Sequence, residues 1–244
     1  MKTILLSGPG KNSLSTELME RTLASVREAG DAPIFLTGEG DAFSAGLNLK
    51  EVASLDEAGM TRFLNVLEDL VEALYGHPGP TLAWVNGHAI AGGCVMALCC
   101  DVRVVTARAG VRIGLNEVAL GLRFPPRTLR MCADRVPGPA LSRVLLEAEL
   151  YDAKEAIELG LVDVLGEESE ARARLEKLAS HPRDAYGAAK RAMRASLAVP
   201  EAEQRRFVSD VIPKWVTPEL KERLRAVLDK KPAKHEPAKQ EPAK

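Results

Sequence analysis

The stretch NGHAIAGGCVMALCCD, residues 86–101, holds a histidine, an aspartate and three of the chain's four cysteines. Cys94, Cys99 and Cys100 follow a C-x4-C-C pattern, which is not the ligand spacing of a zinc or iron–sulfur site. Free cysteine is among the most buried residue types, so these thiols are predicted to be small core side chains. The sequence therefore predicts neither a metal site nor a redox cofactor.

The glycine pair of the same stretch, Gly92-Gly93, lies between a predicted strand and an apolar predicted helix. Glycine at such a place lets backbone amides approach a ligand closely, and free amides at a helix start carry partial positive charge that suits an oxyanion. Close packing of the strand against the helix explains the glycines equally well. The residues of this stretch leave both interpretations open.

A second glycine-containing segment, GDAFSAGLNLKE, spans residues 40–51. It lacks the phosphate-loop pattern, and Ser44 lacks the G-x-S-x-G frame of a nucleophile elbow because alanine stands two residues before it. Ser44 is therefore predicted to be a turn residue rather than a nucleophile. The groups of this segment that could bind a ligand are the backbone amides around Ala45, Gly46 and Leu47.

The third segment, RIGLNEVALGL at residues 112–122, contains one acid in an apolar run, Glu117. Burial of that run would raise the pKa of Glu117 toward neutrality and suit the side chain to general-base catalysis. Glutamate is usually exposed, so an exposed Glu117 beside a turn is the interpretation favoured by this segment alone.

Strand and helix patterns alternate over the first two thirds of the chain and predict an α/β fold with a helical C-terminal part. The predicted strands are 3–7, 34–37, 81–85 and 102–106. The predicted helices are 15–29, 60–75, 92–99, 139–146 and 153–158, followed by helical sequence from 167 to about 230. Residues 231–244, a Pro/Lys/Glu/Ala repeat, are predicted to be a disordered, solvated tail.

The overall composition argues against several classes of protein, namely nucleic-acid-binding, membrane-spanning and secreted proteins. A formal net charge of −1 argues against binding to nucleic acid or to an anionic membrane surface. No apolar run reaches the length of a membrane span, and the apolar patch after Met1 is too short for a secretory signal. Four cysteines in such a chain are expected to be reduced, which favours a cytoplasmic protein.

Together, FSAGLNL, NGHAIAGGC–ALCCD, IGLNEVALGL and AKEAIELGLVD resemble the crotonase (enoyl-CoA hydratase/isomerase) superfamily over roughly residues 8–165. Each motif is weak by itself, whereas their order and spacing are specific. The resemblance implies a crotonase-like spiral of ββα turns over residues 1–180 and a C-terminal helical trimerisation region at 181–230. It also implies a homotrimer or a dimer of trimers.

By this resemblance, the amides of Leu47 and Gly92 form an oxyanion hole for the thioester oxygen of an acyl-CoA, and Glu117 is the base. Coenzyme A is then part of the substrate, and no cofactor is expected. The substrate contacts implied are Ser44, Ala45, Gly46, Asn48, Asn116, Val95 and Lys11. Lys11 would meet a CoA phosphate or be a solvated turn lysine, and Asn116 would orient the substrate or shape a turn.

The chain departs from the hydratases of this superfamily at Val95, where they carry a second glutamate, and it has GLRFPPRTLR in place of Pro-Gly-x-Gly-Gly. In these segments and in FVSDVIPKWVTPELKERLRAVL, residues 207–228, it resembles the delta-3,delta-2-enoyl-CoA isomerases of fatty-acid metabolism. The expected function is therefore isomerisation of 3-enoyl-CoA to 2-trans-enoyl-CoA. Hydratase, hydrolase or decarboxylase chemistry and non-catalytic acyl-CoA binding are the alternatives.

Overall fold

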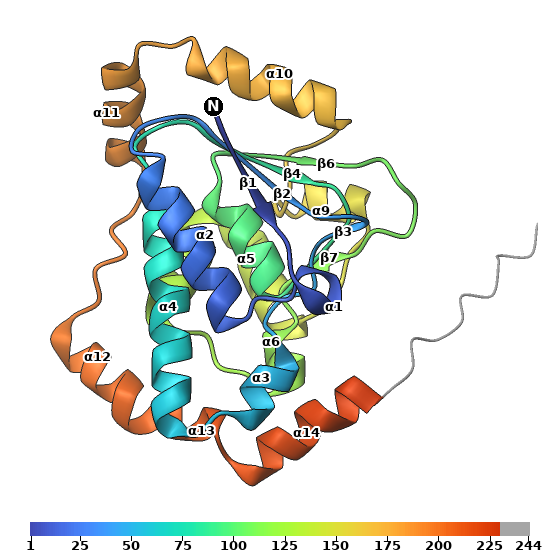
Figure 1. Ribbon diagram of the computed structural model, residues 1–244, viewed down its shortest axis with the longest axis vertical. Coiled ribbons are helices and arrows are strands. Elements are labelled where there is room, and N and C mark those ends of the chain that lie inside the picture. The colour runs from blue at the N-terminus through green and yellow to red at the C-terminus, as the bar shows by residue number, and fades with distance from the viewer. Residues whose placement is uncertain (230–244) are drawn as a thin grey trace, which may run out of the picture.

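The computed structural model describes residues 1–229 and contains two parallel β-sheets (Figure 1). The larger sheet has the order β1-β2-β4-β6-β8 and the smaller one β3-β5-β7. The strands of the larger sheet are β1 (Lys2–Leu6), β2 (Ile34–Gly38), β4 (Thr81–Val85), β6 (Val102–Val105) and β8 (Val164–Leu165). Those of the smaller sheet are β3 (Ala42–Ser44), β5 (His88–Ile90) and β7 (Ile113–Gly114).

The chain repeatedly passes from a strand of the larger sheet to a strand of the smaller one and then into a helix. β2 and β3 lead to α3 (Leu49–Ser54) and α4 (Glu57–Tyr75), and β4 and β5 lead to α5 (Gly92–Cys99). β6 and β7 lead to α6 (Glu117–Leu120). These strand–strand–helix turns are the spiral expected from the sequence, and they bring the starts of α5 and α6 to the same small sheet.

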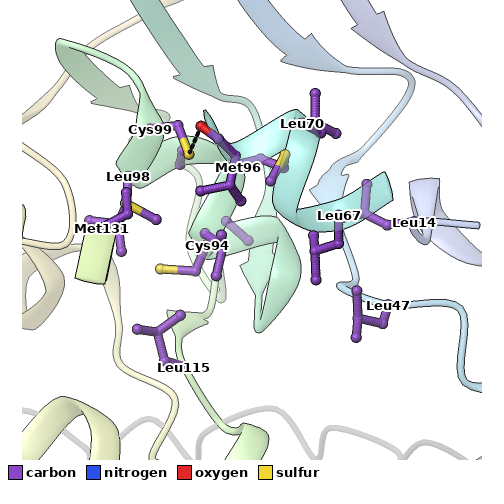
Figure 2. Close-up of a cluster of buried hydrophobic side chains, with 14 of the residues drawn as sticks. Leu14, Leu47, Leu67, Leu70, Cys94, Met96, Leu98, Cys99, Leu115 and Met131 are labelled. Carbon is purple, nitrogen blue, oxygen red and sulfur yellow. Dashed lines mark hydrogen bonds between the residues drawn. The ribbon is translucent and has the colours of Figure 1, made fainter. Parts of the chain in front are cut away.

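Helices cover both faces of the larger sheet. α2 (Thr16–Glu28), α4 and α5 pack on one face and form the main hydrophobic core, in which all eight residues of α5 are buried. In Figure 2, α5 side chains lie between Leu67 and Leu70 of α4 and Met131. On the other face, α10 (Glu168–Ala179) buries Ala171 and Leu175 against the sheet.

The remaining helical segments have 4 to 12 residues. They are α1 (Pro9–Asn12), α7 (Pro126–Arg135), α8 (Gly138–Ser142), the π-helical turn η1 (Arg143–Glu147), α9 (Ala153–Glu158), α11 (Arg183–Met193), α12 (Glu201–Arg206), the π-helical turn η2 (Phe207–Val211), α13 (Ile212–Trp215) and α14 (Pro218–Asp229). α13 packs on α4 and α14 packs on α3, so the last helices pass along the lower edge of the molecule in Figure 1. Among residues 1–229, no helix is long and apolar enough to cross a membrane.

The predicted elements 81–85, 92–99 and 153–158 agree with β4, α5 and α9. α4 begins three residues before its prediction because the Asp56 side chain caps it by accepting from Gly59 N. The helical region predicted from residue 167 is confirmed as a series of helices, α10 to α14, with prolines at 182, 200, 213 and 218 at or near the breaks between them. Its role in trimerisation stays a prediction, and the predicted tail, 231–244, lies outside the described residues.

Candidate active site

The loop after β3 is held by hydrogen bonds that use most of its polar groups. The Ser44 hydroxyl donates to Asn12 O at 2.8 Å and accepts from Gly46 N at 3.2 Å, and Ala45 N donates to Lys11 O at 3.0 Å. Ser44 is thus the last residue of β3 and braces the loop, which corrects its interpretation as a turn residue. The amides of Ala45 and Gly46 are both occupied.

The next amide of the loop, that of Leu47, is free. Leu47 forms an isolated parallel bridge with Leu14, in which Leu14 N donates to Gly46 O at 2.7 Å and Asn48 N donates to Leu14 O at 2.9 Å. This pairing turns the Leu47 N–H away from Leu14, and it finds no acceptor within residues 1–229. Of the three amides considered from the sequence, only this one is available to a ligand.

The start of α5 supplies a second free amide beside the first. Ala91, the residue before the helix, has φ 50° and donates to Gly114 O at 2.8 Å. This backbone conformation is strained for alanine, and strain of this kind is typical of functional sites. In the described part of the chain Gly92 N has no acceptor, and a Cβ built on Gly46 would lie 3.3 Å from it. Two unpaired amides therefore meet at the positive end of α5.

Glu117 begins α6 and is buried, with 6% of its surface exposed. The expectation from segment composition, an exposed glutamate, is wrong, since the turn places Glu117 inward and its neighbour Val118, 44% exposed, outward. Burial raises the pKa of Glu117 to about 8, although its own backbone N–H acts in the opposite direction. Its Oε2 and the Asn116 Oδ1 are buried without a hydrogen-bond partner in the described residues.

Glu117 lies within electrostatic reach of α5. Burial raises the pKa of the Cys94 thiol, and the charge of Glu117 raises it further. Val95, the next residue, is 1% exposed and belongs to the hydrophobic core, so this position supplies no polar side chain. All four cysteines are free and buried, which confirms the prediction that they are core side chains.

A cleft of about 230 Å³ has Leu47 in its lining, whereas Gly92 and Glu117 are not among its lining residues. It is lined by Pro9, Gly10, Ser13, Ala45, Leu47, Asn48, Leu49, Lys50 and Leu228. Asn48 also caps α3 by accepting from Glu51 N at 3.3 Å. Lys11 is exposed outside this lining and pairs with Asp41 at 3.5 Å, whereas Lys50, which the sequence analysis did not single out, provides a cation at the cleft.

A sequence profile described as Enoyl-CoA hydratase/isomerase matches residues 2–237. The chain belongs to this family. A probable enoyl-CoA hydratase of Mycobacterium avium is 31% identical over 84% of each chain, and the mitochondrial enoyl-CoA delta isomerase 1 of Mus musculus is 33% identical over 79% of this chain and 70% of its own. The crystal structure of human mitochondrial delta3-delta2-enoyl-CoA isomerase superposes with a TM-score of 0.82 at 25% identity, covering 93% of this chain and 92% of that one.

These comparisons confirm the crotonase fold and an enzyme of the hydratase/isomerase family. A structure from Bacillus halodurans described as an enoyl-CoA hydratase, with a TM-score of 0.79 and 24% identity, has the same fold and covers 92% of this chain and 95% of its own. Both reaction names therefore occur among the relatives of this chain.

For this member of the enoyl-CoA hydratase/isomerase family, kcat/KM should rise with pH and level off above about 8. This prediction takes Glu117 as the base expected from the sequence, which can accept a proton only as the carboxylate, and burial raises its pKa to about 8. Below that value, kcat/KM should fall about tenfold per pH unit. Initial rates measured over a pH series with subsaturating substrate would check this, and a plateau reaching down to pH 6 would contradict it.

Burial of Glu117 should also cost stability as the pH rises. The unfolded chain releases this proton near 4.5 and the folded chain only near 8, so the native state loses stability between these values and is unaffected by this group below 4.5. At about 1.4 kcal/mol per pKa unit, the loss is on the order of 5 kcal/mol. Glu117→Gln should remove it, so urea unfolding at several pH values should show a stability advantage of the variant that grows toward pH 8.

Proposed function

We propose that this protein isomerises 3-enoyl-CoA thioesters to 2-trans-enoyl-CoA. The observation that supports this is the buried carboxylate of Glu117, whose Oε2 has no hydrogen-bond partner among residues 1–229. Near the start of α5, the position where a second polar group would be needed is the apolar Val95. A double-bond shift needs a single base that removes a proton and returns it two carbons away. Adding water would require a second polar group to hold the water, and Val95 cannot do so.

The reaction begins when the thioester oxygen accepts hydrogen bonds from the amides of Leu47 and Gly92. These donors and the positive end of α5 stabilise the enolate that forms when the C2 proton leaves, and each such donor contributes about 3 kcal/mol to lowering the barrier. The Glu117 carboxylate takes this proton. Because its apolar surroundings favour the neutral acid, Glu117 holds the proton and then delivers it to C4.

The cleft beside Leu47 is the proposed path of the CoA arm. Ala45 and Asn48 line it, while Ser44 and Gly46 shape the loop that presents the Leu47 amide. Asn116, whose Oδ1 is unpaired beside the base, is proposed to orient the acyl chain, and exposed Lys11 to meet a phosphate at the outer end. A proton shift between two carbons needs neither a metal ion nor a redox cofactor, so none is proposed.

We further infer a homotrimer, or a dimer of trimers, in the cytoplasm and a role in fatty-acid metabolism. The support is family membership for the assembly and the pathway, and the four free thiols for a reducing compartment. Light scattering coupled to size-exclusion chromatography would test the assembly, and a monomer would contradict it.

The test of the proposed reaction uses wild-type protein and 3-hexenoyl-CoA, with products separated by chromatography. The expected product is 2-trans-hexenoyl-CoA, and addition of 2-trans-hexenoyl-CoA should give no 3-hydroxy product. Hydration would instead support the activity named for the Mycobacterium avium relative. Release of CoA would indicate a hydrolase. Loss of carbon dioxide from a carboxylated acyl-CoA would indicate a decarboxylase. Calorimetric binding of acetyl-CoA without turnover of any of these thioesters would indicate a binding protein.

A further inference from the structure

The C-terminal end of α5, opposite the proposed oxyanion hole, is held by one arginine of α7. Arg135 Nε donates to Leu98 O at 3.0 Å, and its Nη2 donates to Cys100 O at 2.9 Å and to Asp101 O at 3.3 Å. The last carbonyls of a helix have no partner within the helix and carry its negative partial charge. The Arg135 guanidinium donates hydrogen bonds to carbonyls at this end of α5 and places a positive charge beside them.

The charge of Arg135 is directed at the helix end rather than at a carboxylate. Within residues 1–229 it forms no ion pair, whereas Lys190 and Arg194, two cations at the same end, both pair with the Asp101 carboxylate. Burial lowers the pKa of Arg135, and Arg103 and Arg194 lower it further, while the charges of Asp163 and Asp101 raise it, and a guanidinium remains charged near neutrality. A partly buried cation is costly unless strong acceptors surround it, and the direct acceptors of Arg135 are the carbonyls at and just after the end of α5.

The helix that carries Arg135 is itself fixed at its other end. Glu68 of α4, 4% exposed, accepts from Arg127 N at 2.7 Å and from Thr128 N at 2.9 Å, and the Thr128 hydroxyl donates to it at 2.7 Å. Met131, in the middle of α7, lies close to Leu98 of α5 in Figure 2. α7 is therefore anchored to α4 at its start and to α5 at its end.

We propose that Arg135 is a positioning residue of the oxyanion hole. By fixing the C-terminal end of α5, it keeps the Gly92 amide at the opposite end in line with the thioester oxygen. α5 has eight residues and is only about 12 Å long, so a shift or tilt at one end is transmitted to the other. A donor stabilises an oxyanion only at about 2.7–3.1 Å, so a displacement of a few tenths of an ångström weakens it. This inference rests on the proposed enolate chemistry.

The test uses acetoacetyl-CoA, whose enolate absorbs ultraviolet light and whose ionisation an oxyanion hole promotes. The ratio of bound enolate to bound keto form at constant pH then reports the strength of the hole, independently of turnover. Arg135→Lys keeps the charge but loses the fork of donors. We expect this variant to lower the enolate ratio and kcat about tenfold, a part of the effect of losing one donor. KM should change by less than about twofold, because the ground-state oxygen is bound weakly.

Arg130→Lys is the matched control, since Arg130 lies on the same helix and pairs with Glu203 rather than with α5. It should leave the enolate ratio unchanged. An unchanged ratio in Arg135→Lys, with wild-type protein giving a clear enolate signal, would overturn the positioning role. Absence of the signal in wild-type protein would instead count against the proposed function. If Arg135→Lys does not fold, Glu68→Gln, which loosens the other end of α7, should lower the ratio, and an unchanged ratio there would likewise overturn the proposal.

Discussion

Glu117→Gln is expected to lower kcat for isomerisation of 3-hexenoyl-CoA about a thousandfold or more. One positioned base typically contributes about 10²- to 10⁴-fold, and here the same carboxylate is proposed to act in both proton transfers. Glutamine preserves the shape of the side chain but can neither accept nor return the C2 proton. Steady-state kinetics with purified variant and wild-type enzyme would measure the loss.

The control for this variant is substrate binding. Calorimetry with acetyl-CoA should give a similar Kd for Glu117→Gln and wild-type protein, because the amides of Leu47 and Gly92 remain in place. Glu57→Gln, at an exposed position in the first turn of α4, should retain wild-type kcat. Turnover of Glu117→Gln near the wild-type value would show that another group moves the proton.

Composition located the loop of the candidate site but did not distinguish its amides, and only the family resemblance singled out Leu47. From composition alone, the amides of Ala45, Gly46 and Leu47 are equivalent. The bridge between Leu47 and Leu14, which lie far apart in the sequence, is what distinguishes the Leu47 amide from the others. The same holds for Ser44, whose hydroxyl contacts Asn12, 32 residues away. Such contacts depend on how the strands are placed, and local sequence patterns do not record them.

Burial of Glu117 illustrates a second limit of local patterns. Its neighbour Val118 is 44% exposed while Glu117 is 6% exposed, so the apolar residue faces outward and the acid inward. The average exposures of valine and glutamate in proteins predict the reverse order. Departures from such averages are expected at functional sites. Family resemblance, which singled out Glu117 as the expected base, carried information that composition lacked.

The contacts of α7 could not have been predicted from spacing either. Arg135 is 37 residues from Leu98, and Glu68 is 60 residues from Thr128. Regular elements with a complete local signal, such as β4 and α5, were predicted with the correct bounds. The short elements β3 and α3 were missed, because three to six residues give too little periodicity to recognise.

Gly93→Ala is expected to reduce kcat about a hundredfold, the effect of losing one oxyanion donor, and to do so more severely than Gly92→Ala. A Cβ on Gly93 would lie 2.4 Å from Ser44 O, a backbone atom that cannot move without displacing the loop that presents the Leu47 amide. The nearest atoms to a Cβ on Gly92 would be side-chain carbons of Leu14 and Leu47, at 3.1 Å each, and these need to shift by only a few tenths of an ångström.

Kinetics with both glycine variants, together with thermal unfolding to establish that each is folded at the assay temperature, would measure the difference. The bound enolate ratio of acetoacetyl-CoA should fall in the same order as kcat, since both depend on the distance between the two amides. Equal losses in the two variants would mean that side-chain crowding, rather than displacement of the loop, limits the reaction. Full activity of Gly93→Ala would show that the separation of β3 and α5 does not control the oxyanion hole, because the loop would then have moved without consequence for the enolate.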